Sequence, residues 1–134
     1  RISAQAQRLL DVTREALRLA IAACRPGQRV GDISATIQEW VESQGYHVVR
    51  EYTGHGVGRA MHEDPQVLNW GQHGYGAPLR PGMTLALEPM VTIGPPDLYT
   101  KADHWTVATV DGGLCAHFEH SVAITEGEPD ILTL

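Results

Sequence analysis

The order of two hydrophobic periods along the chain constrains its fold more than any other feature. Apolar side chains recur every three or four residues over residues 3–24 and 31–44, which predicts two amphipathic helices. After residue 45 the pattern changes to alternation or to short apolar runs, which is typical of strands. The expected strands are 46–50, 83–93, 105–110 and 114–125. Since no helical pattern separates the later strands, we expect an α+β fold with two helices packed on one face of an antiparallel sheet.

Residues that favour caps and turns support these boundaries. Ser3 is a suitable N-cap for the first helix, and Pro26 followed by Gly27 ends it. Gly45 stands where a left-handed residue commonly follows a helix. Stretches rich in glycine and proline predict the loops between the strands. These loops are 53–58, 71–82 and 94–104.

Composition excludes several classes of protein. A length of 134 residues suits one domain, and a net charge of −6 argues against binding to nucleic acid or to an anionic membrane. No apolar run approaches the roughly 20 residues that span a bilayer. The only cysteines, Cys24 and Cys115, are far apart and lack the spacing of a zinc or redox motif, so we expect two reduced thiols in a cytoplasmic protein.

An acidic residue interrupts the most apolar of the expected strands. Glu88 lies within the run LALEPMV, and a buried carboxylate needs a cation or a hydrogen-bond network because burial without one costs several kcal/mol. Pro89 follows it and donates no hydrogen bond, so the strand is expected to bend, bulge or lie at an edge there. Two interpretations remain open: a carboxylate directed into a functional site, and an edge-strand glutamate facing water.

The last expected strand carries a second such carboxylate. By alternation, Ala116 and Val122 share a face with Leu114, Phe118 and Ile124, and this face is expected to be core. The opposite face carries Glu119, with His117 and Ser121 two positions away on either side. That polar face either borders a site or simply faces solvent.

A third segment combines glycines with histidines. In TGHGVGRAMHE, residues 53–63, His55 lies between Gly54 and Gly56, and His62 follows seven positions later. Glycines allow a close backbone approach, so the segment either directs His55 and His62 at one site or is a turn with incidental histidines. The spacing matches no helical zinc signature. One imidazole, His55, together with Glu88 and Glu119 suits a divalent cation such as Mn, Fe, Co or Zn, provided that the fold brings them together.

Four ordered blocks of sequence carry a family resemblance. The chain resembles type I methionine aminopeptidase over essentially its whole length. The matching blocks are GHGVGRAMHEDPQV at 54–67, LRPGMTLALEPMV at 79–91, DHWTVATVDG at 103–112 and AHFEHSVAIT at 116–125. The resemblance implies an α+β pita-bread domain built from two halves, of which residues 1–134 correspond to the C-terminal half.

The resemblance also implies site residues. His55, Glu88 and Glu119 would be metal ligands, with Glu119 bridging two divalent ions (Co, Mn, Fe or Zn) and Glu88 also moving a proton. The two remaining ligands would be aspartates of the other half, and no stretch before His55 resembles their segment. His62 would contact the substrate near the scissile carbonyl. Met61, which replaces a frequent aromatic residue, and Trp105 would lie near the pocket for the methionine side chain. His117 departs from the common pattern and receives no role.

The implied activity is the removal of N-terminal methionine from peptides and nascent chains. We expect the chain alone to show little or no activity without the missing N-terminal half, supplied covalently or as a partner chain. Two alternatives remain: a proline-directed peptidase of the same fold, and a non-catalytic binding module that has lost its metal site. The runs HEDPQV at 62–67 and WTVAT at 105–109 favour the methionine aminopeptidase.

Overall fold

The computed structural model describes residues 2–133 and confirms both helices. Helix α1 spans Ala4–Ala22 and begins at Ser3, whose hydroxyl oxygen accepts a hydrogen bond from the Ala6 amide at 3.1 Å. Helix α2 spans Val30–Ser43. It is followed by Gly45 with a φ of 79°, the left-handed residue that the sequence predicts.

Within residues 2–133, ten short strands form three antiparallel sheets. The strands are β1 (His47–Val48), β2 (Gly54–Gly56), β3 (Glu63–Val67), β4 (Thr84–Leu87), β5 (Met90–Thr92), β6 (Leu98–Thr100), β7 (Val107–Thr109), β8 (Cys115–His117), β9 (His120–Ala123) and β10 (Asp130–Ile131). One sheet has the order β10-β9-β4-β2-β3, a second has the order β1-β5-β8, and β6 pairs with β7 as a separate hairpin.

A single register joins the two larger sheets. Leu87 of β4 pairs with His120 of β9, and Met90 of β5 pairs with His117 of β8. The residues between these pairs continue the same register, which sets Glu88 opposite Glu119. Pro89 carries no N–H, and the two sheets separate at this point. The expected interruption at Glu88 and Pro89 is therefore confirmed.

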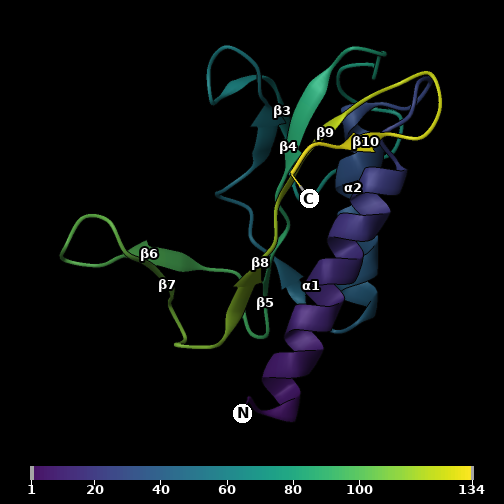
Figure 1. The fold of residues 1–134 in the computed structure, drawn as a ribbon. Helices are drawn as coiled ribbons and strands as arrows, with labels where there is room; N and C mark the ends of the chain where they lie inside the picture. Colours follow the sequence, from purple (N-terminus) through teal and green to yellow (C-terminus); the bar gives the residue numbers. More distant parts are fainter. Residues whose placement is uncertain (1, 134) are drawn as a thin grey trace.

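The helices pack together against the sheets and form the core. In Figure 1, α1 and α2 lie side by side along the strands, while the β6–β7 hairpin extends away from them. The indole N–H of Trp40 on α2 donates to the Val12 carbonyl of α1 at 3.0 Å. The largest fully buried side chains come from both layers and include Ile33, Ile37, Leu85 and Leu87. Burying these apolar faces is the main favourable term in holding the helices on the sheets.

Several local predictions were wrong. Residues 54–56, expected in a loop, form β2 between β3 and β4, and β3 and β6 were not expected as strands. The run 114–125 is divided into β8 and β9 rather than continuous. Leu114, expected in the core, is exposed because it precedes β8. Within residues 2–133 there is no helix long and apolar enough to cross a bilayer.

Candidate metal centre

Glu88 occupies the break between the two larger sheets. Its side chain is 14% exposed, and its backbone carbonyl accepts a hydrogen bond from the buried Asn69 amide at 3.2 Å. That hydrogen bond helps to hold the main chain where Pro89 ends the ladder of β4. The break turns the Glu88 carboxylate toward polar groups of neighbouring strands instead of the apolar core.

Glu119 and His117 meet Glu88 across the ladder. Glu119 follows from the register, since antiparallel partners lie directly opposite one another. Nε2 of His117 lies 3.3 Å from Oε2 of Glu88. One ligand atom from each of the three side chains lies within 4.8 Å of the other two, a grouping suited to a metal ion.

His55 approaches Glu88 from strand β2. It pairs with Ala86 of β4, two residues before Glu88, and its Nε2 lies 3.4 Å from Oε1 of Glu88. Its Nδ1 lies 2.8 Å from the Gly56 carbonyl oxygen, which only accepts hydrogen bonds, so Nδ1 carries the proton. In the neutral ring, Nε2 then presents a lone pair to a carboxylate. The Nε2 lone pair of His55 and the Glu88 carboxylate therefore face each other as two acceptors, and a shared proton or a metal cation between them would satisfy both. These donor atoms fit a metal ion.

The glycines that flank His55 explain how it reaches this position. A Cβ on Gly54 would overlap the Ala86 carbonyl oxygen and lie 3.2 Å from that of Val67. A Cβ on Gly56 would overlap the Asp64 carbonyl and lie 2.9 Å from the Glu63 carbonyl oxygen. Strand β2 therefore fits between its neighbours only without side chains at these two positions. The glycines therefore belong to a close-packed strand between β3 and β4, and not to the turn with incidental histidines that was the alternative.

The electrostatics of Glu88 favour an added positive charge. Burial raises the pKa of Glu88, and the negative charge of Glu119 raises it further. His117 and His55 act in the opposite direction, and neither cancels the rise. A divalent cation would relieve both the burial of one carboxylate and its repulsion by the other.

His62 lies beside His55 at a second, more polar opening. The two ring centroids are 4.4 Å apart with the planes tilted by 57°. Both rings line a cavity of about 390 Å³ together with Thr53, Glu63 and Asp64. The structure therefore brings the two histidines of the glycine-rich segment together.

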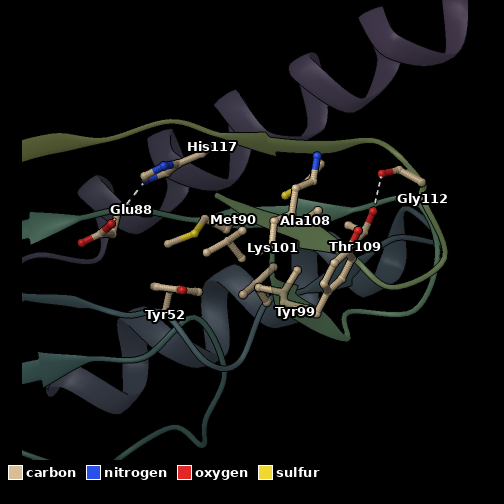
Figure 2. Close-up of a pocket in the computed structure, with 14 residues that line it drawn as sticks. Tyr52, Glu88, Met90, Tyr99, Lys101, Ala108, Thr109, Gly112 and His117 are labelled. Atoms are coloured by element: carbon tan, nitrogen blue, oxygen red, sulfur yellow. Dashed lines mark hydrogen bonds and ion pairs between the residues drawn. The ribbon is translucent and has the colours of Figure 1, made fainter. Parts of the chain in front are cut away.

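A larger cavity opens on the other side of Glu88. Its volume is about 690 Å³, and it lies between the β6–β7 hairpin and the β1-β5-β8 sheet. Figure 2 shows Glu88 and His117 joined at one end, with Met90 beside them and Tyr99 and Thr109 further along. The Glu88 group therefore lies at the border of an open, largely apolar space.

Two predicted substrate residues lie apart from this group. Met61 is 74% exposed and Trp105 is 87% exposed. Neither lines either of the two cavities described above. Their role near a methionine pocket stays a prediction. Conversely, His117 received no role from the sequence, although its position two residues before Glu119 on one strand face was a usable signal.

Comparison with known proteins identifies the family. The model of metallopeptidase family M24 matches residues 1–126. The chain belongs to this family. Membership implies divalent metal chemistry, in agreement with the donor set around Glu88.

Relatives in family M24 include proteins of high similarity. Methionine aminopeptidase 1 of Bacillus subtilis is 52% identical over 132 residues, which cover 98% of this chain and 53% of the relative. Methionine aminopeptidase of Escherichia coli strain K12 is 45% identical over 128 residues, covering 96% of this chain and 48% of the relative. The chain thus spans about half the length of these curated relatives.

Solved structures confirm the α+β pita-bread class. The crystal structure of methionine aminopeptidase from Thermotoga maritima matches with a TM-score of 0.96 at 54% identity, covering 98% of this chain and 53% of that one. Prolidase from Pyrococcus furiosus matches with a TM-score of 0.76 at 21% identity, covering 100% of this chain and 34% of that one. The second likeness shows the shared fold alone.

Proposed function

We propose that residues 1–134 are the C-terminal half of a methionine aminopeptidase that hydrolyses the peptide bond after an N-terminal methionine. The observation that carries this proposal is the placement of Glu88 with His55 on one oxygen and with Glu119 opposite. The identity of about half of all positions with proteins named methionine aminopeptidase supports it.

His55, Glu88 and Glu119 would hold two divalent ions, drawn from Co, Mn, Fe or Zn, with Glu119 between them. Such ions supply a nucleophile at neutral pH by lowering the pKa of water, and they polarise a carbonyl group. The mixed imidazole and carboxylate donors suit these metals better than Mg or Ca. The ring orientation of His55, fixed through Nδ1, is the usual arrangement of a metal-binding histidine.

The chain's own side chains would position the substrate. His62, which lies beside His55, would donate a hydrogen bond to the scissile carbonyl and stabilise the negative charge that develops there, a contribution of about 2.7–4 kcal/mol in other enzymes. Glu88, whose pKa is raised mainly by burial, would hold and release a proton during the reaction while it remains a ligand. Met61 and Trp105 would reach the methionine side chain only in the assembled site.

The 134 residues alone are proposed to have little or no peptidase activity. They supply three of the implied ligands, and two aspartates of the other half would complete the set. Exposed apolar side chains at the large cavity and the hairpin next to it support a missing partner surface, since a closed domain would cover them. They are Tyr52, Tyr99, Val107 and, on the loop of the hairpin, Trp105. The partners would be the other half of the domain and the N-terminus of a peptide or nascent chain, in the cytoplasm, with no nucleic acid or membrane.

Two other functions are less well supported. A proline-directed peptidase shares the fold, but the prolidase structures are only 20–21% identical to this chain. A non-catalytic binding module would have no use for a largely buried carboxylate placed between two imidazoles. Metal content separates the module from an enzyme, and substrate preference separates the two peptidases.

The test is methionine release from a Met-Ala-Ser peptide and dipeptide cleavage of an Ala-Pro substrate, each with Mn²⁺ or Co²⁺. It uses the 134-residue chain alone and the chain joined to a first half of the domain. We expect methionine release from the joined protein only, and a fall of at least about 100-fold in Glu119→Gln, the upper end of what loss of a metal-supporting group costs.

Glu126→Gln is the matched control, because Glu126 is an exposed carboxylate in a turn. It should retain the activity of the joined protein. Preferential cleavage of Ala-Pro, or equal activity of Glu119→Gln and Glu126→Gln, would overturn the proposed function. Release of methionine by the 134 residues alone would overturn the requirement for a second half.

A further inference from the structure

The two oxygens of Glu88 face two different histidines. Oε1 lies 3.4 Å from Nε2 of His55, and Oε2 lies 3.3 Å from Nε2 of His117. His55 belongs to β2 and is 13% exposed, whereas His117 ends β8 and is 43% exposed. Glu88 therefore has an inner side toward His55 and an outer side toward His117 and the large cavity.

The outer side is the more compact group of donors. The ligand atoms of Glu88, His117 and Glu119 all lie within 4.8 Å of one another. Among the residues that the structure describes, this is the one group of three or more histidine, cysteine, aspartate or glutamate side chains whose ligand atoms all lie within that distance of one another. Zinc binds imidazole nitrogen and carboxylate oxygen at about 2.0–2.2 Å, so modest rotations of partly exposed side chains would close the group on an ion.

We propose that His117 is itself a metal ligand, and that Glu88, His117 and Glu119 form a cation position supplied entirely by this chain. This inference rests on the proposed function in taking Glu88 and Glu119 as ligands of a divalent ion. It adds a nitrogen donor to the set of His55, Glu88 and Glu119. It also means that these 134 residues bind a cation before any other half of the domain contributes a ligand.

The position of His117 gives the ion a route and a preference. Figure 2 shows His117 and Glu88 at the end of the cavity, which provides access from solvent. An imidazole donor favours Zn²⁺ over Mn²⁺, whereas carboxylates alone favour the harder ion. Loss of the His117 imidazole should therefore weaken Zn²⁺ binding more than Mn²⁺ binding. A residue that only positioned Glu88 would affect both ions alike.

The experiment titrates the chelator-treated 134-residue chain with ZnCl₂ by calorimetry and with MnCl₂ by electron paramagnetic resonance. We expect His117→Gln to weaken Zn²⁺ binding at least tenfold and Mn²⁺ binding by a smaller factor. In the wild-type chain, the ¹⁵N resonance of His117 Nε2 should shift on addition of Zn²⁺. The helical circular dichroism signal checks that each variant is folded, and the exposure of His117 makes the substitution mild.

His120→Gln is the matched control, since this histidine lies three residues away and its Nδ1 contacts Thr133 Oγ1 at 3.0 Å. Cys115→Ser tests for binding through the nearby thiol of β8. Both should bind Zn²⁺ within twofold of the wild-type chain. The inference is overturned by unchanged Zn²⁺ affinity in His117→Gln, by equal losses for the two ions, or by a wild-type chain that binds no Zn²⁺.

The experiments distinguish failure of this inference from failure of the proposed function. A chain that binds Zn²⁺ through His117 but releases no methionine when joined to a first half would keep this inference and reject the peptidase. A joined protein that releases methionine, with unchanged Zn²⁺ affinity in His117→Gln, would reject this inference and keep the peptidase.

Discussion

Replacing Gly54 by alanine tests whether close packing of strand β2 sets the position of His55. The new methyl group would overlap the Ala86 carbonyl oxygen and lie 3.3 Å from the Val67 Cβ. Both neighbours are backbone-linked atoms of adjacent strands, so β2 has to move. Overpacking of this kind costs about 1–3 kcal/mol, and the lower entropy of the unfolded alanine chain returns about 0.4–1 kcal/mol. We expect a net loss of about 1–2 kcal/mol in the free energy of unfolding.

The assay is urea unfolding followed by the helical circular dichroism signal. With a slope of about 1–3 kcal/mol per molar urea, Gly54→Ala should lower the midpoint by roughly 1 M. Gly127→Ala is the control, because a Cβ at this position meets no atom within 4 Å and the backbone of Gly127 does not have a positive φ. The control should be neutral or slightly stabilising. Equal midpoints for the two variants would refute the explanation of why glycines flank His55.

Two further predictions concern helix α2. The ring nitrogens of His73 lie 3.1 Å from a carboxylate oxygen of Glu39 and 3.2 Å from one of Asp32, and these two carboxylates raise the pKa of His73. The ion pairs therefore stabilise the fold fully below the unfolded pKa of about 6.5, and this stabilisation is lost as pH rises through the folded pKa. In the wild-type chain, the urea midpoint of unfolding should therefore fall as pH rises from 6 to 9, and in His73→Gln this fall should be smaller. The same pH profile in both proteins would contradict a stabilising role for the ion pairs. Trp40→Phe removes the hydrogen bond to the Val12 carbonyl and should lower the free energy of unfolding by about 0.5–1.5 kcal/mol in urea unfolding. The control is Trp105→Phe, which replaces an exposed tryptophan. A loss no larger than that of the control would show that the bond contributes nothing.

The sequence predicts the helices well because their signals are local. Apolar spacing, the Ser3 cap and Gly45 each act within a few residues, and the structure confirms them. The break at Glu88 was equally predictable, because Pro89 lacks an N–H wherever it occurs. The α+β class follows from the order of these elements, and the solved relatives confirm it.

Strand β2 was missed because its stability comes from its neighbours. Glycine has a poor intrinsic preference for strands, and only the close approach of β3 and β4 makes it necessary at positions 54 and 56. Tertiary packing here outweighs propensity. No periodicity in the segment itself reveals those neighbours.

The convergence at Glu88 was only partly predictable. Alternation along 114–125 correctly gives Glu119 and His117 a shared face, but Glu88 meets them only because one register continues across two sheets. A shift of that register by one residue would turn Glu119 to the other side of the strand. Long-range register depends on the whole core, and for this reason the sequence did not assign His117.

The central claim is that Glu88, Glu119 and at least one imidazole surround a common divalent ion. Its most direct test is X-ray diffraction from crystals of the protein grown with Mn²⁺, with data collected at the manganese absorption edge. The account predicts an anomalous peak in contact with carboxylate oxygens of both Glu88 and Glu119. An ordered site with these carboxylates directed apart, and with no peak between them at a saturating Mn²⁺ concentration, would contradict it.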